Sequence, residues 1–223
     1  MKTVAVIPCH NEAKYIQDVV SRSAKHVDVV CVVDNNSTDG TCSVASLAGA
    51  KVVSCQAKGM GNATATGIWA TQDADVVVTL DGDGQHNPDE IPGLAAPVQE
   101  KIADIAIGVR LDNSGMPVYR RLGNHIIALA ANLGACVQVV DAQCGFRALG
   151  SLARQIPLTS PGFGCVTELI IKSRRQGLRL VQVPVSCIYH DDLKANSAMN
   201  PVRHGISVLM VTLRWRLWEY FGL

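Results

Sequence analysis

The sequence lacks any uninterrupted run of about eighteen apolar residues, the length a helix needs to cross a bilayer. We therefore expect no membrane-spanning helix. The N-terminal apolar run at residues 3–7 is followed at once by polar and acidic residues, which predicts a strand and not a signal peptide. Charged residues make up only 17% of the chain and the net charge is +1, which argues against a nucleic-acid-binding protein.

Recognisable cysteine and phosphate-loop motifs are absent as well. The eight cysteines form no CxxC pair and no zinc-ligand spacing with histidine, so structural zinc is not expected. Reduced, buried thiols are typical of a cytosolic protein, and we expect a cytoplasmic location, with the inner face of the membrane as the alternative. The absence of GxxxxGK[ST] argues against a P-loop NTPase, and the KGMG turn lacks the spacing of a dinucleotide fingerprint.

What the chain does have is a regular alternation of strand-like and helix-like segments. Short β-branched runs predict strands at residues 3–7, 27–33, 51–54, 75–80 and 104–109, with helices at 12–24, 40–48, 61–71 and 89–100 between them. Helices at 119–133 and 167–175, a strand pair or long strand at 178–188 and a loop at 191–200 follow. This order predicts an α/β fold with a Rossmann-like, mixed but mostly parallel sheet and helices on both faces.

A chain of 223 residues that is nearly half apolar can bury one large core. We expect one catalytic domain at residues 1–200, followed by an amphipathic, non-transmembrane helix at 201–223. That helix interleaves arginines with Trp215, Trp218, Tyr220 and Phe221, so it could lie at a bilayer interface. The alternative is a helix packed on the protein body or at a dimer interface.

The most specific signal for function is the segment LDGDGQH after the fourth predicted strand. Ligands of open parallel sheets bind beyond the carboxyl ends of the strands. Asp81 and Asp83 flank a glycine there, and Gln85 follows. Because Mg²⁺ and Mn²⁺ prefer oxygen ligands, usually one or two carboxylates with water and substrate phosphates, we expect Asp83 and Gln85 in the first shell and Asp81 nearby.

Several motifs in fixed order resemble the family 2 inverting glycosyltransferases of A-type fold. The motifs are PCHNE, VVDNNSTDGT, KGMGNATATG, LDGDGQHNPDEI and DAQCGFRAL. The resemblance covers roughly residues 1–190 and is strongest to the dolichyl- or polyprenyl-phosphate sugar synthases. It implies the nucleotide-diphospho-sugar transferase fold, a UDP- or GDP-sugar donor, Mg²⁺ or Mn²⁺, and a polyprenyl-phosphate acceptor.

The resemblance also implies roles for individual residues. The nucleotide-sugar pocket would be formed by Pro8, His10, Glu12, Asp34, Lys58, Gly61, Asn62, Asp81, Gly82 and Asp83. Arg110 and Arg121 would meet acceptor phosphate or diphosphate, while Asp141 and Arg147 would line the acceptor side and Glu168 would lie near the sugar. The sequence departs from the family's motifs at three places, which bear on which nucleobase the donor carries. His10 replaces a common tyrosine, Asn35-Asn36 replaces Asp-Gly, and Cys144 replaces serine.

The acceptor decides which of these residues would be catalytic. A sugar hydroxyl needs a general base, for which Asp141 or Glu168 would be the candidates. A lipid monophosphate arrives largely ionised at neutral pH and needs arginines to position it. Three hypotheses remain: transfer to a polyprenyl phosphate, transfer to a glycan or small-molecule hydroxyl, and a non-catalytic membrane-peripheral scaffold. A homodimer or a membrane-protein partner is compatible with each.

Overall fold

The computed structural model describes residues 1–110, 115–190 and 201–221, so the loop expected at 191–200 lies outside the described residues. Seven strands form one sheet: β1 (Thr3–Cys9), β2 (Val29–Asp34), β3 (Lys51–Ser54), β4 (Val76–Thr79), β5 (Ile105–Arg110), β6 (Arg147–Leu149) and β7 (Leu180–Val185). Their spatial order is β3-β2-β1-β4-β6-β5-β7. Among the strands of the described residues, β6 alone runs antiparallel to its neighbours, which gives the mixed, mostly parallel sheet that the sequence predicts.

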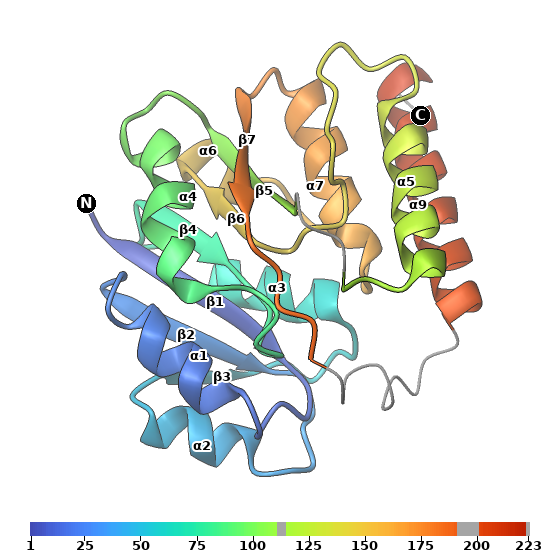
Figure 1. Ribbon diagram of the computed structural model, residues 1–223. Helices are drawn as coiled ribbons and strands as arrows, with labels where there is room; N and C mark the ends of the chain where they lie inside the picture. The colour runs from blue at the N-terminus through green and yellow to red at the C-terminus, as the bar shows by residue number, and fades with distance from the viewer. Residues whose placement is uncertain (111–114, 191–200, 222–223) are drawn as a thin grey trace.

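Helices cover both faces of this sheet (Figure 1). One face carries α1 (Ile16–Ser23), α2 (Thr41–Leu47), the 3-10 helix η1 (Pro88–Glu90) and α4 (Ile91–Gln99). The other carries α3 (Met60–Trp69), α5 (Val118–Asn132) and α7 (Gly164–Arg175), with α9 (Pro201–Phe221) packed on α5 and α7. The short α6 (Ser151–Arg154) follows β6. Each face therefore has its own apolar core.

The local sequence explains these elements. The centre of β4 is a run of three valines that is buried on both sides, as expected of a strand inside a covered sheet. In α1, the apolar residues Ile16, Val19 and Val20 recur at helical spacing and point into the core. Pro88 occupies the first position of η1, where its missing N–H costs no hydrogen bond.

One strand differs from the sequence-based expectation. The strand β6 was not predicted, because its three residues are too short for a periodic pattern and Arg147 begins it. Of the two alternatives for residues 178–188, a strand pair or one long strand, the structure has the single strand β7. All eight cysteines are free thiols. None of the described helices is both long enough and apolar enough to cross a bilayer.

Candidate active site

A cleft of about 680 Å³ opens at the carboxyl edge of the sheet. It is lined by residues 8–12, 35, 36, 38, 58–60, 63, 81–83 and 163. These residues come from the segments that follow β1, β2, β3 and β4, together with the first turns of α3 and one residue just before α7. The cleft thus lies where parallel sheets bind ligands, and its volume suits a small molecule.

The turn after β4 presents two carboxylates to this cleft. Asp81 and Asp83 both line it, and the side chain of Asp81 is 32% exposed. The Oδ1 atom of Asp83 accepts the backbone N–H of Gln85 at 3.0 Å, which closes the turn. Gly84 has a φ of 74°, a left-handed conformation that glycine adopts without strain. The glycine therefore allows the tight turn that brings the two carboxylates to one wall.

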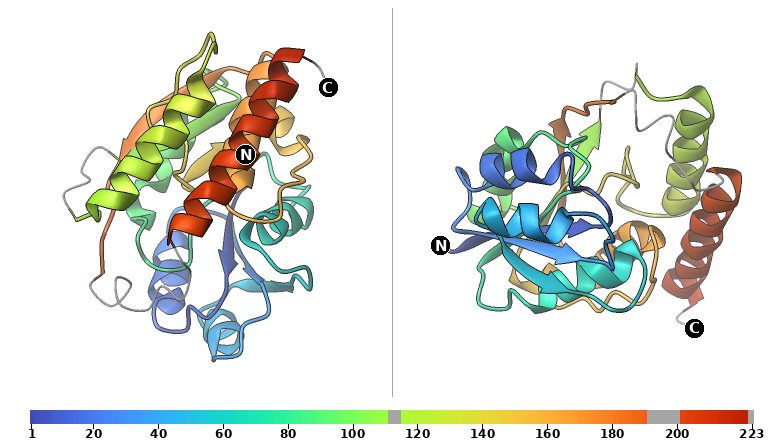
Figure 2. Two further views of the ribbon diagram at one scale, coloured as in Figure 1. Left: turned by 90° about the vertical axis from the view of Figure 1, so that its right-hand side faces the viewer. Right: turned by 90° about the horizontal axis from the view of Figure 1, so that it is seen from below.

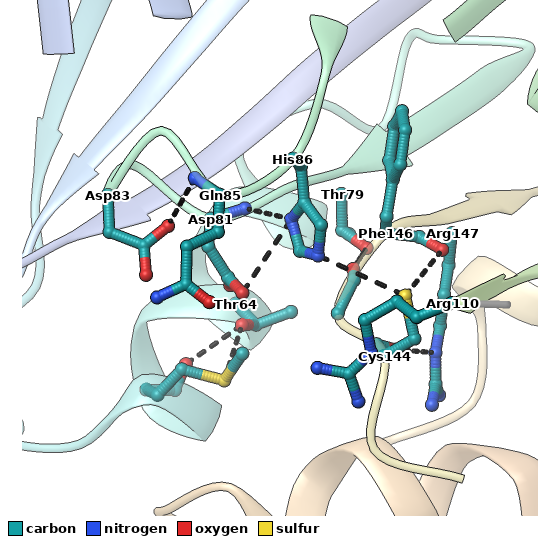
Figure 3. A network of polar contacts seen from close by, with 12 residues as sticks. Thr64, Thr79, Asp81, Asp83, Gln85, His86, Arg110, Cys144, Phe146 and Arg147 are labelled. Carbon is teal, nitrogen blue, oxygen red and sulfur yellow. Dashed lines mark hydrogen bonds and ion pairs between the residues drawn. The ribbon is translucent and has the colours of Figure 1, made fainter. Parts of the chain in front are cut away.

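His86 fixes this turn from behind (Figure 3). Its Nδ1 atom accepts the backbone N–H of Asp81 at 3.1 Å, and its Nε2 atom lies 3.9 Å from the sulfur of Cys144. The ring also stacks on Phe146 with centroids 5.3 Å apart. Burial lowers the pKa of His86 to about 4, so the ring is neutral at pH 7. A neutral ring that accepts at Nδ1 carries its proton on Nε2, which makes His86 a positioning residue.

Three carboxyl groups lie close together at the floor of the cleft. Burial, followed by the charges of Asp83 and Asp81, raises the pKa of Glu12 to about 8. Burial also raises the pKa of Asp83, and the nearby Asp81 raises it further. Burial raises the pKa of Asp81 despite the opposing charges of Arg110 and Arg147. Carboxylates that disfavour one another's ionised form in this way are stabilised by a bound cation.

The oxygen donors at this turn fit Mg²⁺ or Mn²⁺ as the sequence suggests. Across residues 1–110, 115–190 and 201–221, no three His, Cys, Asp or Glu side chains are placed to hold a metal by themselves. One or two carboxylates completed by water and substrate phosphates are the usual magnesium arrangement, and Asp81 and Asp83 match it. Gln85 does not line the cleft, although its backbone oxygen accepts the N–H of Ile188 at 2.8 Å.

The opposite wall of the cleft is organised by Asn35. Its Oδ1 atom accepts the N–H of Gly59 at 2.7 Å, while its Nδ2 atom donates to the carbonyl oxygens of Cys55 and Ala57 at 3.0 and 2.8 Å. Its own carbonyl oxygen bonds Nδ1 of His10 at 2.9 Å. One amide side chain, just past the end of β2, therefore holds the Lys58–Gly59 turn.

Seven of the residues expected at the nucleotide-sugar pocket line the cleft. They are Pro8, His10, Glu12, Lys58, Asp81, Gly82 and Asp83. Asp34 does not line it: this residue is only 8% exposed, and its Oδ1 atom accepts the N–H of Ser37 at 3.2 Å.

The Gly-rich turn at the start of α3 does not offer its N–H groups to a ligand. The N–H groups of Gly61 and Asn62 both donate to the carbonyl oxygen of Pro161, at 2.8 and 3.3 Å. A Cβ atom on Gly61 would lie 2.0 Å from the carbonyl oxygen of Ser160. Gly61 therefore serves close packing between α3 and the segment before α7, and neither Gly61 nor Asn62 lines the cleft in which the motifs place them.

Arg110 and Asp141 lie together beyond the end of β5. Nε of Arg110 donates to Oδ2 of Asp141 at 2.6 Å, and Nη2 donates to Oδ1 at 2.9 Å. Burial alone would raise the pKa of Asp141, but the hydrogen bonds and charge of Arg110 hold it below its usual range. Asp141 Oδ1 also accepts the N–H of Gln143 at 3.0 Å. Both carboxylate oxygens are thus engaged, which does not suit a general base.

Arg147 and Glu168 are buried and hydrogen-bonded within the protein. The guanidinium of Arg147 donates to the carbonyl oxygens of Cys144, Val166 and Ala142, and the side chain is 2% exposed. Burial lowers its pKa to about 10.

The carboxylate of Glu168 accepts from Thr159, Ser160 and Lys172, and the residue is fully buried. Neither Arg147 nor Glu168 lines the cleft. Their contacts hold α7 against the segments that precede it in the chain, in place of the acceptor-side and sugar-side positions expected from the motifs. Arg121 lies on the exposed first turn of α5 and also does not line the cleft.

Sequence reasoning missed several residues of the cleft wall. Five residues line the cleft although the sequence did not predict them as pocket residues: Asn35, Asn36, Thr38, Met60 and Phe163. For Asn35 and Asn36 the signal was present, because polar residues directly after a parallel strand belong to the ligand edge. Phe163 had no such signal: it reaches the cleft from a distant loop.

Comparisons with known proteins agree with this geometry. Residues 4–160 match the family model described as glycosyl transferase family 2. The chain is 29% identical over 212 residues to a UDP-N-acetylglucosamine–dolichyl-phosphate N-acetylglucosaminyltransferase of Methanococcus voltae, covering 82% of this chain and 84% of the relative. It is 30% identical to an undecaprenyl-phosphate mannosyltransferase of Micrococcus luteus over 98% of this chain and 97% of the relative.

A solved structure shares the architecture. Glucosyl-3-phosphoglycerate synthase from Mycobacterium tuberculosis, in complex with Mn²⁺, uridine diphosphate and phosphoglyceric acid, superposes with a TM-score of 0.71 and 25% identity, over 95% of this chain and 78% of that one. The mixed sheet with its covering helices is that of the A-type glycosyltransferase fold. The protein belongs to glycosyl transferase family 2 and is an enzyme that transfers sugars.

Proposed function

We propose that the protein moves a sugar from a UDP- or GDP-sugar to a polyprenyl phosphate, with inversion at the anomeric carbon and with Mg²⁺ or Mn²⁺ as cofactor. The observation that carries the proposal is the pair Asp81 and Asp83 on the wall of a cleft of about 680 Å³, where burial raises the pKa of both carboxyl groups. The metal, when bound, neutralises charge that develops on the departing nucleoside diphosphate. Asp83 and Asp81, with Gln85 beside them, would hold it.

The donor would lie across the cleft. His10, Asn35 and Lys58 form the wall toward β2 and β3, and we place the nucleotide there because the diphosphate then reaches Asp81 and Asp83 on the opposite wall. The sugar would face the segment around Phe163. The proposal covers uracil and guanine alike as the base of the donor.

In the transfer step, an acceptor oxygen bonds to the anomeric carbon as the bond from that carbon to the diphosphate breaks. The nucleoside diphosphate leaves with the electron pair. A phosphate acceptor has a second pKa near about 6 and therefore attacks as an anion without a protein base. Arg110, at the end of β5, and Arg121, on the first turn of α5, are the cations proposed to position it.

Neither candidate general base, Asp141 or Glu168, is free to take a proton from an acceptor, and this favours a phosphate acceptor over a hydroxyl. Both oxygens of Asp141 accept bonds in its pair with Arg110, and Glu168 is buried away from the cleft. The names of the two relatives, a dolichyl-phosphate and an undecaprenyl-phosphate transferase, support the same acceptor class. Transfer to a glycan or small-molecule hydroxyl is the competing function. The scaffold hypothesis is set aside, because the chain belongs to a family of sugar-transferring enzymes.

The test is a donor and acceptor screen on the intact chain. Thermal shift with UDP, GDP and their sugars, with Mn²⁺, with Mg²⁺ and with chelator, identifies the donor by its metal-dependent stabilisation. Transfer is then measured with a short polyprenyl phosphate, with the matching polyprenyl alcohol and with free sugars. We expect product only with the phosphate. Transfer to an alcohol or a sugar but not to the phosphate would replace the proposal with the hydroxyl-acceptor function.

A further inference from the structure

An apolar stripe runs along the outer side of α5. Its five apolar side chains are between 44% and 71% exposed, and the last of them lies just past the helix end. They are Val118, Leu122, Ile126, Leu129 and Leu133. Residues spaced by three and four lie on one side of a helix, so these side chains form a continuous stripe. The opposite side of α5 carries Ile127, Ala128 and Ala131, which are buried.

A second stripe of the same kind runs along α9. Its five apolar side chains are between 37% and 63% exposed, again with spacings of three and four. They are Ile206, Met210, Leu213, Leu217 and Phe221. Val208, Thr212 and Trp215 on the other side of the helix are buried. Each of the two helices therefore packs on the protein by one side and presents an apolar side outward.

The two helices lie next to each other on one surface. They contact each other, α9 also packs on α7, and the left view of Figure 2 shows α5 and α9 side by side at the front of the molecule. We call the exposed stripes of both helices the α5–α9 face. With a rise of 1.5 Å per residue and a helix diameter of about 10 Å, the two helices together cover roughly 450 Å², and the stripes are the apolar part of this area. Apolar patches of a few hundred Å² on a monomer are often functional.

The charges around the α5–α9 face are one-sided. The helix α5 contains no Asp or Glu. Glu219 is the single acidic residue of α9, and it is paired with Arg216 and with Arg174. Arg121, His125 and Arg214 are exposed beside the stripes. An apolar face bordered by cationic side chains complements an anionic lipid surface.

We propose that the α5–α9 face docks on the surface of a bilayer that contains anionic lipid. A second copy of the chain fits less well, because a stable dimer buries about 800 Å² per partner. In a two-fold dimer the face would also meet itself, so arginines would oppose arginines with no acidic side chain to pair with them. Docking engages both helices, not α9 alone, and it requires no donor or acceptor.

Docking in this way would place the enzyme's ligand edge close to the lipid. The helix α5 begins at the carboxyl edge of the sheet, just beyond the segment that follows Arg110. Gly115 anchors this end, since a Cβ atom there would lie 2.6 Å from the ring of Tyr189, which follows β7. A membrane-bound phosphate would thus approach Arg110 and Arg121 from the side on which α5 starts.

Vesicle flotation tests the proposal. The intact protein is mixed with vesicles of phosphatidylcholine alone or of phosphatidylcholine with phosphatidylglycerol, without any sugar nucleotide. The α5 variant carries Leu122→Glu and Leu129→Glu, and the α9 variant carries Met210→Glu and Leu217→Glu. A matched control places the same change at the exposed residues Leu47 and Ile102, far from the face (L47E and I102E).

We expect the wild type to float with the anionic vesicles and each face variant to lose roughly tenfold or more of its partitioning, since an inserted leucine is replaced by a charge. The control should float like the wild type, and Arg214→Gln should weaken binding to anionic vesicles only. Circular dichroism and thermal unfolding establish that each variant is folded.

Three results would overturn the proposal. They are failure of the wild type to float with either vesicle, loss of flotation in the α9 variant alone, and a dimer in light scattering that the face variants dissociate. The last result would assign the face to a second copy. Because the assay contains neither donor nor acceptor, its outcome does not depend on the proposed function.

Discussion

Arg110 and Asp141 form a two-bonded ion pair, with N–O distances of 2.6 and 2.9 Å and side chains only about a tenth exposed. Removing one partner of such a pair leaves the other buried and unpaired. Asp141→Asn should therefore lower the free energy of unfolding by about 3 kcal/mol, measured by urea denaturation. If the variant unfolds like the wild type but turns over far more slowly, Asp141 acts as a base after all.

Asp83→Ala should abolish the metal-dependent thermal stabilisation by nucleotide. The variant removes one of the two carboxylates proposed to hold the cation, and ligand stabilisation scales with the logarithm of ligand concentration over Kd. The melting temperature without ligands should stay close to that of the wild type. Asp18→Ala on α1, where the side chain is 72% exposed, serves as the control. Unchanged stabilisation in the Asp83 variant would remove the metal assignment.

Gly145→Ala should displace the carboxylate of Asp81. A Cβ atom at position 145 would lie 3.0 and 3.2 Å from the two oxygens of Asp81, closer than ordinary contact. The carboxylate must move by a few tenths of an ångström, and we expect kcat to fall by about tenfold because metal sites require accurate placement. Gly162→Ala is the control, because nothing lies within 4 Å of its added carbon. Equal kcat in both variants would show that Asp81 tolerates displacement.

Asn35→Asp should weaken nucleotide binding. The amide Nδ2 of Asn35 donates to the carbonyl oxygens of Cys55 and Ala57, and a carboxylate at that position would face the same oxygens without a proton to share. The Lys58–Gly59 turn would lose its anchor, so Kd for the nucleotide, measured by calorimetry, should rise by about tenfold or more. Nucleotide affinity equal to that of the wild type would show that the turn holds its shape without this anchor.

Protonation of Glu168 should destabilise the fold at acid pH. Burial would raise the pKa of Glu168, but hydrogen bonds from Lys172, Ser160 and Thr159 outweigh it and lower the pKa. A lowered pKa contributes stability above the ordinary glutamate pKa of about 4.3, and the contribution is lost as the pH falls through the folded-state value. The stability difference between wild type and Glu168→Gln should therefore shrink below about pH 4.3. A difference that stays constant from neutral to strongly acidic pH would contradict this assignment.

The sequence predicts the first half of the fold well, because its strands and helices repeat in a regular pattern. The strand at 51–54 has the expected bounds, and β1, β2, β4 and β5 differ by one or two residues at their ends. The helix α9 likewise runs from Pro201 to Phe221. In each case the apolar spacing within the segment suffices to define the element.

The buried polar contacts of the second half of the chain are harder to predict because no periodic pattern marks them. Arg147 and Glu168 look like site residues by motif, but they bond to irregular segments between helices and strands, at Ala142 and Thr159 for example. Asn35 is similar: its position after a strand is visible in the sequence, yet its bond to Gly59 is not. Local periodicity carries no information about which buried polar groups satisfy one another.

The three residues of β6 have a consequence for how the chain assembles. In the described sheet, Arg147–Leu149 is the link between β4 and β5, which do not pair with each other. During synthesis, β1 to β5 emerge first, and the facing edges of β4 and β5 stay open until residue 149 has left the ribosome. Open edges attract other strands. A nascent or truncated chain that ends before this point should therefore aggregate, even though it already contains both carboxylates of the cleft.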